Sequence, residues 1–431
     1  MRYLAFLISS LCLSEGWSYF HNVDMLKNSN QFIDYDYIDS QIVNDDYIPE
    51  RSNLTHKIVG YLPYWKYDTY EDLDYSLLTE INYFSAELDS YGNIINDHNW
   101  SSIAFIDYAQ ERGVKIKLCA TLFGSDELTI LLSSESNRQN AISSLLNLVI
   151  ERGADGIDID FELLPLSQRA NLVTFMVELS DTFHEYIEDP IITMATPAID
   201  WSNAWDYNQL AQITDGLFIM GYNYFYAGSN QAGPISPLGG YFYDIDYTVD
   251  DYLNKTSYQT DKLILGLPYY GYDWPVLDSF MNSETTSQGI AKTHEQAMNL
   301  KDVHGSNYNN DSNAPWISYN SSNWQQCWYE DSLSISSKYS YAKNNDLAGI
   351  GIWALGYDNN NSKMWGSISD QFSDAVVGDF NYDGIVNIVD IVSLVNLILS
   401  NNYIVSYDLN NDSFVNVLDV LELVSIVLDL H

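Results

Sequence analysis

Four acidic residues lie close together near the middle of the chain, in the segment Asp-Gly-Ile-Asp-Ile-Asp-Phe-Glu at residues 155–162. Asp158, Asp160 and Glu162 fall at alternate positions, so in a strand their side chains share one face at steps of about 7 Å. Carboxyl groups this close cannot all ionise cheaply without a metal ion or shared protons, so one should stay protonated near neutral pH. A protonated carboxyl group can act as a general acid. We expect Glu162, at the C-terminal end of the strand, to be that acid.

An acidic strand end and a divalent-metal site are the alternative interpretations of this cluster, and the surrounding pattern helps to choose. Short apolar segments that could form strands recur along the chain, with helical stretches between them, at residues 58–62, 80–86, 115–122, 156–161, 191–196, 216–222, 263–267 and 349–353. Strands that alternate with helices in this way predict a (β/α)8 TIM barrel. Such barrels carry their active sites at the C-terminal ends of the strands, where Glu162 falls.

The length of 431 residues suits a barrel of about 250 residues or more together with a small second module. The net charge is −41, from 59 acidic and 18 basic residues. This charge opposes binding to nucleic acid or to an anionic membrane. We interpret it as a solvated acidic surface.

The N-terminal region predicts export. Met1 and Arg2 precede an apolar stretch at residues 3–13, which is typical of a signal peptide, and we place that peptide at residues 1–18. The product is therefore expected to be secreted. Residues 19–55 are rich in Asn, Asp, Tyr and Ser without clear periodicity, and we expect an acidic linker there. No later apolar run is long enough to predict a membrane span.

The cysteines do not define a disulfide pattern. Outside the expected signal peptide the chain has Cys119 and Cys327, and two cysteines do not define a disulfide framework. Whether they pair stays open, although Cys119 lies in an apolar run where a buried small side chain is expected.

The acidic segment resembles the signature of family 18 glycoside hydrolases, Asp-x-x-Asp-x-Asp-x-Glu, which is complete here and begins at Asp155. Further segments resemble the first, sixth, seventh and eighth strands of that family, at residues 60–65, 220–224, 266–271 and 351–356. The resemblance implies a catalytic barrel at residues 56–372, with a small α+β insertion between strands seven and eight at about 275–345. The chain departs from the family where Ala-Thr-Leu-Phe-Gly at 120–124 replaces Ser-x-Gly-Gly and where Asn223 replaces an Asp.

The resemblance also implies a mechanism. Family 18 members are retaining glycosidases that use the 2-acetamido oxygen of the substrate in place of a protein nucleophile. Glu162 would then protonate the glycosidic oxygen, and Asp160 would bond the acetamido N–H and stabilise the oxazolinium intermediate. Asp158 would share a proton with Asp160, and Tyr222 would hydrogen-bond the acetamido carbonyl. No cofactor is expected for catalysis, and Asp155 should have a supporting structural role because its strand parity differs.

Aromatic residues near these segments could bind sugar rings, whose apolar faces stack on aromatic faces. By the resemblance, Trp353 should form the floor of the −1 sugar site. The other candidates for substrate binding are Tyr61, Trp65, Trp201, Asn223, Tyr224 and Trp274. For any single aromatic side chain, packing in the core is the alternative.

A duplicated pattern near the C-terminus predicts calcium binding. Oxygen ligands at loop positions 1, 3, 5, 9 and 12, with a backbone carbonyl at position 7, are the EF-hand arrangement. The expected ligands are Asp379, Asn381, Asp383, Ile385, Asn387 and Asp390 in the first loop and Asp408, Asn410, Asp412, Phe414, Asn416 and Asp419 in the second. Apolar helices are expected after each loop, at residues 391–399 and 420–428. A duplicated loop and helix with Asp at position 12 resembles a dockerin, which we place at 376–431, with two Ca²⁺ sites and a cohesin-bearing protein as partner.

These features together suggest a secreted chitinase-like enzyme, with a monomeric catalytic domain that is docked through the dockerin to a cohesin. Its expected substrates are β-1,4-linked N-acetylglucosamine polymers, chitin or chitooligosaccharides. A peptidoglycan or N-glycan N-acetylglucosaminidase is an alternative. A non-catalytic chitin-binding lectin is another, which the intact Glu162 disfavours.

Overall fold

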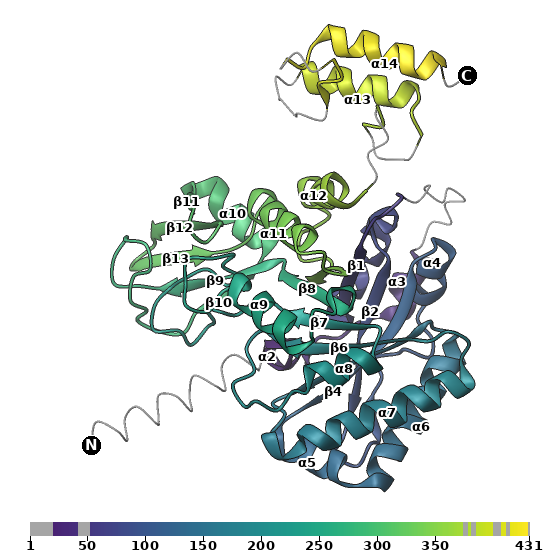
Figure 1. Cartoon of the computed structure of the whole chain (residues 1–431). Coiled ribbons are helices and arrows are strands. Elements are labelled where there is room, and N and C mark those ends of the chain that lie inside the picture. Colours follow the sequence, from purple (N-terminus) through teal and green to yellow (C-terminus); the bar gives the residue numbers. More distant parts are fainter. Residues whose placement is uncertain are drawn as a thin grey trace.

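The computed structural model describes residues 20–41, 52–373, 378–380, 385–399, 407–410 and 414–429 (Figure 1). The signal peptide expected at residues 1–18 lies outside these residues. Most of the described chain forms a barrel with helices around it, an insertion with its own sheet, and two short N-terminal helices. Two further helices follow near the C-terminus.

The barrel is closed and parallel, as predicted. Its sheet runs in the order β1-β14-β8-β7-β6-β5-β4-β2, and β1 also pairs with β2 to close the ring. The eight strands are β1 (Lys57–Pro63), β2 (Glu80–Leu88), β4 (Lys115–Phe123), β5 (Gly156–Glu162), β6 (Ile191–Pro197), β7 (Gly216–Met220), β8 (Leu263–Pro268) and β14 (Gly349–Trp353). All match predicted segments, although β7 ends at Met220 and so leaves Tyr222 in the loop that follows. A short strand, β3 (Ile94–Asn96), pairs antiparallel with the end of β2.

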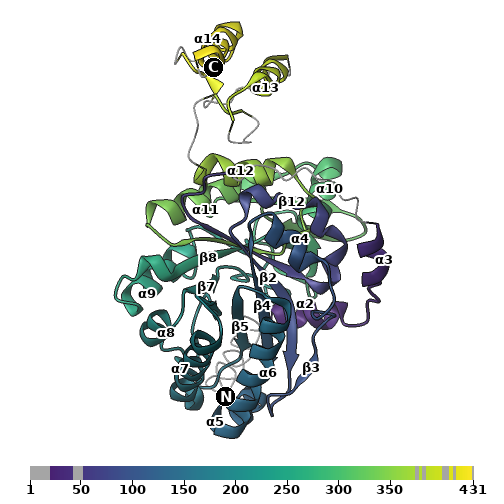
Figure 2. The ribbon, with the colours of Figure 1, turned by 90° about the vertical axis from the view of Figure 1, so that its right-hand side faces the viewer.

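Helices cover the outside of the barrel (Figure 2). They are α4 (Phe105–Glu111), α5 (Ser125–Ser133), α6 (Glu135–Arg152), α7 (Arg169–Tyr186), α8 (Tyr207–Ile213), α9 (Ile245–Lys255), α11 (Ser332–Asn344) and α12 (Ser362–Phe372), with short 3₁₀ turns at Tyr64–Asp72, Tyr75–Leu77, Leu166–Gln168 and Thr260–Lys262. The strands are buried on both faces, which explains why they read as apolar runs. The long helix α6 shows how the ends are set: Ser134 caps its N-terminus and Gly153 ends it in the left-handed conformation.

The insertion between the seventh and eighth barrel strands is a separate five-stranded antiparallel sheet in the order β10-β9-β13-β12-β11. Its elements are β9 (Tyr270–Pro275), β10 (Ile290–Thr293), α10 (His294–His304), β11 (Asn307–Asn309), β12 (Ala314–Asn320) and β13 (Trp324–Trp328). The insertion therefore begins a few residues before the expected position 275. It also ends earlier than 345, because α11 packs against β14 and α12 as a helix of the barrel.

Residues 20–40, expected to be part of a linker, instead form two helices, α2 (Phe20–Asn28) and α3 (Tyr35–Ser40), drawn in purple in Figures 1 and 2. Met25, Ile33, Tyr35 and Ile38 pack against the barrel core. These spaced apolar residues are the signal that the interpretation as a linker overlooked. The expected linker residues 42–51 lie outside the described part of the chain.

The C-terminal module contains α13 (Ile388–Leu399) and α14 (Val417–Asp429), which pack on each other. Its small core includes Phe380, Leu394, Tyr407 and Leu423. The prediction of one helix after each loop is confirmed. Within the described residues, no helix combines the length and apolar character needed to cross a membrane.

Candidate active site

The three acids of β5 lie together in the barrel, as their alternate spacing predicts. Asp158 and Asp160 are fully buried, and Glu162 is 2% exposed. Asp155, just before the strand, faces elsewhere: its carboxylate accepts hydrogen bonds from Lys115 and from the backbone N–H of Ile116. These contacts lie at the start of the strand, away from the other three acids, and they are of the kind expected of a structural role for Asp155.

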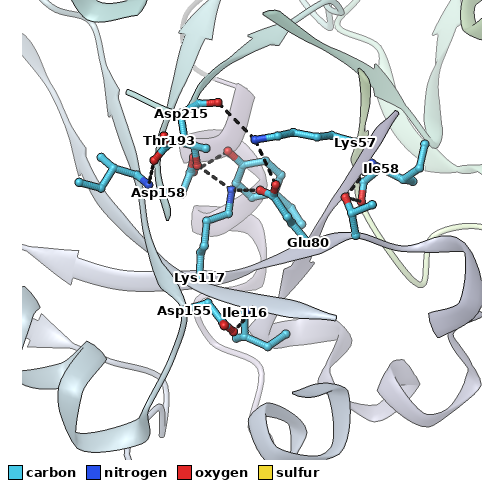
Figure 3. Close-up of polar contacts among 12 residues, drawn as sticks. Lys57, Ile58, Glu80, Ile116, Lys117, Asp155, Asp158, Thr193 and Asp215 are labelled. Carbon is cyan, nitrogen blue, oxygen red and sulfur yellow. Dashed lines mark hydrogen bonds and ion pairs between the residues drawn. The ribbon is translucent and has the colours of Figure 1, made fainter. Parts of the chain in front are cut away.

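Asp158 is held by two hydroxyl groups, one from the neighbouring strand β6 and one from β1, which does not pair with β5. Tyr61 donates to Oδ2 at 2.6 Å, and Thr193 donates to Oδ1 at 2.6 Å. Lys117 Nζ in turn donates to Thr193 Oγ1 at 2.8 Å (Figure 3). Burial raises the pKa of Asp158, while the charge of Lys117 and the two hydroxyl bonds act to lower it. Asp158 is thus linked through Thr193 to a buried cation.

Lys117 is a residue that sequence reasoning missed. Its side chain is fully buried and forms an ion pair with Glu80, with Nζ 2.7 Å from Oε2 (Figure 3). Lys57 Nζ lies 3.3 Å from the other carboxylate oxygen. The signal was present in the sequence, because a lysine inside an apolar barrel strand needs a buried partner. The partner lies on the next strand, at a distance along the chain that no local pattern gives.

Glu162 has the electrostatic character that a general acid needs. Burial and the charge of Asp160 hold its pKa well above the ordinary value, and the backbone of His21 opposes this effect. A carboxyl group in this state keeps its proton near neutral pH. The direction of this shift is the one that the predicted general acid requires, and the assignment of Glu162 as that acid stays a prediction.

A residue from outside the barrel fills the space above these acids. His21, on α2, places Nδ1 2.7 Å from Asp160 Oδ2 and 3.6 Å from Glu162 Oε1. Its Nε2 lies 2.8 Å from the hydroxyl of Tyr222. The imidazole stacks on the indole of Trp353, with ring centroids 3.6 Å apart and an angle of 21° between the planes. His21 thus contacts four residues that the sequence analysis assigned to catalysis or substrate binding, Asp160, Glu162, Tyr222 and Trp353.

The remainder of the N-terminal segment is anchored by two aspartates. Asp24 accepts a hydrogen bond from the hydroxyl of Tyr357, and burial raises the pKa of Asp24. Further along, Asp39 accepts from Tyr67 at 2.7 Å, from Tyr70 at 3.1 Å and from the backbone N–H of Ala104 at 3.1 Å. Sequence analysis did not identify any of these contacts, since they join the segment to residues far along the chain.

Several of the candidate sugar platforms are packed in the interior. Tyr61 is fully buried and its hydroxyl holds Asp158, so its place is below the site. Trp274 is also fully buried, and its indole N–H points to the carbonyls of Tyr226 and Ala227. In this structure both side chains follow the alternative of core packing. Trp353, by contrast, already has a ring stacked on it.

The remaining candidates differ in their access. Trp65 is 5% exposed and donates through its indole N–H to the Tyr357 hydroxyl. Tyr224 and Asn223 are also buried, and Asn223 Oδ1 accepts from Tyr270 at 2.7 Å. Trp201 is 42% exposed. It lines a cavity of about 290 Å³ that reaches Glu162.

Potential metal ligands occur in two places. In the described part of the chain, His21, Asp160 and Glu162 form a group whose ligand atoms lie within 4.8 Å of one another. In the C-terminal module, the two aspartates at loop position 12 are fully buried. Asp390 accepts from the backbone N–H groups of Phe380 and Asn387, and Asp419 accepts from Leu409 and Asn416 in the same way.

The two loops share a hydrogen-bond pattern, in which the buried carboxylate at position 12 accepts from backbone N–H groups near the start of the loop and at position 9. This pattern fits the expected calcium arrangement. Asp379, Ile385, Asp408, Asn410 and Phe414 belong to described parts of these loops. The other expected ligands, Asn381, Asp383 and Asp412, lie outside the described residues. Cys119 and Cys327 are free and buried.

Known proteins resemble the chain over more than half of its length. It is 26% identical over 305 residues to the putative sporulation-specific glycosylase YdhD of Bacillus subtilis, covering 66% of this chain and 69% of that protein. It is 28% identical over 280 residues to human di-N-acetylchitobiase, covering 57% of this chain and 68% of that protein. The crystal structure of a GH18 chitinase from Cycas revoluta in complex with (GlcNAc)3 superposes with a TM-score of 0.67 at 19% identity, over 73% of this chain and 99% of that chain.

Family models assign both parts of the chain. Residues 377–428 match the dockerin type I domain, a class of module that binds calcium. Residues 57–358, which include the whole acidic cluster of β5, match glycosyl hydrolases family 18. The chain therefore belongs to family 18 of the glycosyl hydrolases and carries a C-terminal dockerin type I domain.

Proposed function

We propose that this glycoside hydrolase cleaves β-1,4-linked N-acetylglucosamine polymers by substrate-assisted catalysis. The observation that carries the proposal is the arrangement of Asp160 and Tyr222 around one small planar group, next to Glu162, whose pKa is raised by burial and by the charge of Asp160. The imidazole of His21 occupies that place, with one nitrogen against each side chain. Its nitrogens stand in for the N–H and the carbonyl oxygen of a 2-acetamido group.

The roles of the residues follow from this placement. Asp160 accepts the acetamido N–H, and Tyr222 donates to the acetamido oxygen, which orients that oxygen toward the anomeric carbon. Glu162, with its raised pKa, gives its proton to the glycosidic oxygen. Asp160 then faces a developing positive charge, which a nearby carboxylate stabilises. Asp158, fixed by Tyr61 and Thr193, supports Asp160 from below.

Chitin and chitooligosaccharides are the substrates we favour. Human di-N-acetylchitobiase and a Cycas revoluta chitinase bound to (GlcNAc)3 are among the similar proteins. A second candidate is a bacterial cell-wall glycan with N-acetylglucosamine, because the similarity to a sporulation-specific glycosylase extends over 305 residues. Both substrates carry the 2-acetamido group that the mechanism needs. The lectin alternative is less suitable, since Asp160 and Glu162 are both present.

Product analysis on chitin oligomers, colloidal chitin and purified peptidoglycan, side by side, tests this assignment. We expect β-configured N-acetylglucosamine oligomers from the chitin substrates. Release from peptidoglycan alone would favour the second candidate. Binding of all three without release of any product would favour the lectin.

The dockerin directs the enzyme to a protein partner. We infer that the repeated loops of residues 379–390 and 408–419 each hold one Ca²⁺, with Asp390 and Asp419 as the closing ligands. The folded module would then bind a cohesin-bearing protein outside the cell, following export by the signal peptide at residues 1–18. A pull-down with type I cohesin, with and without a calcium chelator, tests both statements.

A further inference from the structure

The N-terminal segment of residues 20–41 lies where substrate would have to bind. We propose that this segment is an intramolecular inhibitor, which holds the enzyme in a closed form until it is displaced or removed. The inference concerns regulation of the proposed site and therefore rests on the proposed function.

Access to the catalytic residues supports the proposal. With the segment in place, Trp353 and Asp160 are fully buried and Glu162 is 2% exposed. The ring of His21 is itself fully buried and covers the indole face of Trp353 at 3.6 Å. A sugar ring that stacks on the same indole needs that volume, so sugar and histidine cannot be bound together.

The segment meets two polar groups of the site, the carboxylate of Asp160 and the hydroxyl of Tyr222, as a substrate would. His21 contacts both of them at hydrogen-bonding distance. The contacts are therefore specific to the site, and they differ from the loose packing expected of a linker.

His21 is the first anchor of the segment. A second anchor, Asp39, holds the segment at a place outside the catalytic site. The carboxylate of Asp39 accepts three hydrogen bonds, from two tyrosine hydroxyls and one backbone N–H. Between the anchors, α2 exposes the side chains of Val23 (52%) and Leu26 (60%). The segment thus has a barrel-facing side with the anchors His21 and Asp39, to which Asp24 adds a further contact, and a solvent side with exposed apolar side chains, as expected of a piece that can detach.

Closed and open forms in equilibrium lower the apparent affinity for substrate by the fraction of molecules that are open. Weakening either anchor should raise that fraction. Hydrogen bonds to charged groups correspond to a change of about 10-fold to 100-fold in such an equilibrium. The sign of the effect is diagnostic, because loss of a contact that merely stabilises the fold does not raise activity.

The experiment compares the full chain with His21→Ala, Asp39→Ala and the control Leu26→Ala, which alters the solvent side of the same helix. The dissociation constant of chitotetraose is measured by tryptophan fluorescence, and kcat/KM is measured on an aryl chito-oligosaccharide. Hydrogen exchange of the α2 backbone amides is followed with and without saturating chitotetraose. Asp39→Ala is informative because Asp39 touches no residue of the catalytic site.

We expect His21→Ala and Asp39→Ala each to bind chitotetraose about 10-fold or more tightly than the parent and to gain kcat/KM by a similar factor. Leu26→Ala should behave like the parent, and saturating ligand should speed exchange in α2. Parental affinity in both anchor variants, or ligand binding that leaves α2 exchange unchanged, would overturn the proposal. Absence of chitotetraose binding in every protein would instead count against the proposed function, and a loss of activity in the folded Asp39→Ala variant would also overturn the inhibitor role.

Discussion

Replacing Lys117 with methionine should destabilise the barrel by an amount that depends on pH. In the native protein, burial alone would raise the pKa of Glu80, but Lys117 and Lys57 together hold it below the ordinary value. Lys117 Nζ lies 2.7 Å from Glu80 Oε2. The Lys117 side chain is 0% exposed and the Glu80 side chain is 6% exposed. Methionine keeps the volume of the lysine stem and removes its charge. Glu80 is then left with Lys57, whose side chain is 32% exposed.

Removing one partner of a buried ion pair costs about 3–5 kcal/mol. This loss is a large part of a total unfolding free energy of about 5–15 kcal/mol. At about 2 °C per kcal/mol for a domain of this size, it corresponds to a fall in Tm of roughly 6–10 °C. Thr193 also loses its bond to Lys117, so the pKa of Asp158 should rise further above its ordinary value.

The sign of the pH dependence follows from Glu80. A carboxyl group whose pKa is depressed in the folded state contributes stability above its unfolded pKa, and this contribution is lost as pH falls through the folded value. The contribution of Glu80 is therefore present at neutral pH and fades below about pH 4.5, near the ordinary value for glutamate. The deficit of Lys117→Met should be largest near pH 7 and should shrink in acid, where the contribution of Glu80 in the parent fades and Glu80 in the variant takes up a proton.

The assay is urea unfolding of parent and variant at pH 7 and pH 4, followed by tryptophan fluorescence. The double variant Glu80→Gln, Lys117→Met is the matched control, because it removes both charges and should recover most of the stability. A deficit under about 1 kcal/mol at pH 7, or an equal deficit at both pH values, would refute the reasoning about this pair.

Three further predictions concern the calcium loops, the loop after β7 and the mechanism. Chelation of calcium should unfold α13 and α14 without abolishing hydrolysis, since structural metal binding is coupled to the folding of the module; circular dichroism and activity measured together check this, and parallel loss of both would contradict it. Asn223→Asp should move the alkaline limb of the kcat/KM profile to higher pH, because an added carboxylate further raises the already raised pKa of Glu162; an unmoved limb in the folded, active variant would show that the two positions are not coupled. A thiazoline analogue of the oxazolinium intermediate should inhibit in competition with substrate, whereas a fluoro-sugar trapped covalently on a carboxylate of this chain would exclude the mechanism.

The barrel and the acidic cluster could be predicted from the sequence because both depend on short-range spacing. Alternation over β5 places Asp158, Asp160 and Glu162 on one face, and apolar runs mark each of the other strands. The insertion was predicted from the gap before the last strand. Its limits were less accurate, since β9 begins at Tyr270 directly after β8 without a break in the pattern.

The contacts that complete the site could not be predicted in this way. His21 reaches Asp160 across 139 positions of the chain, and the hydroxyl of Tyr222 across 201. Tyr61 shows that residue type alone can also mislead. An aromatic side chain suggested sugar stacking, but the position of Tyr61 on β1 makes it a hydrogen-bond donor to Asp158. Local patterns predict which residues gather at a strand end, but tertiary packing decides which of them substrate can reach.

The central claim is that Glu162 is the general acid of a family 18 hydrolase. Glu162→Gln removes the proton while keeping the shape of the side chain. Its kcat/KM on an N-acetylglucosamine oligomer with a poor leaving group should be measured in the parent chain and in the His21→Ala background, together with oligosaccharide affinity. We predict a fall of about 10²-fold to 10⁴-fold in kcat/KM in both backgrounds, with affinity preserved. Turnover near that of the matching Glu162 protein would contradict the assignment.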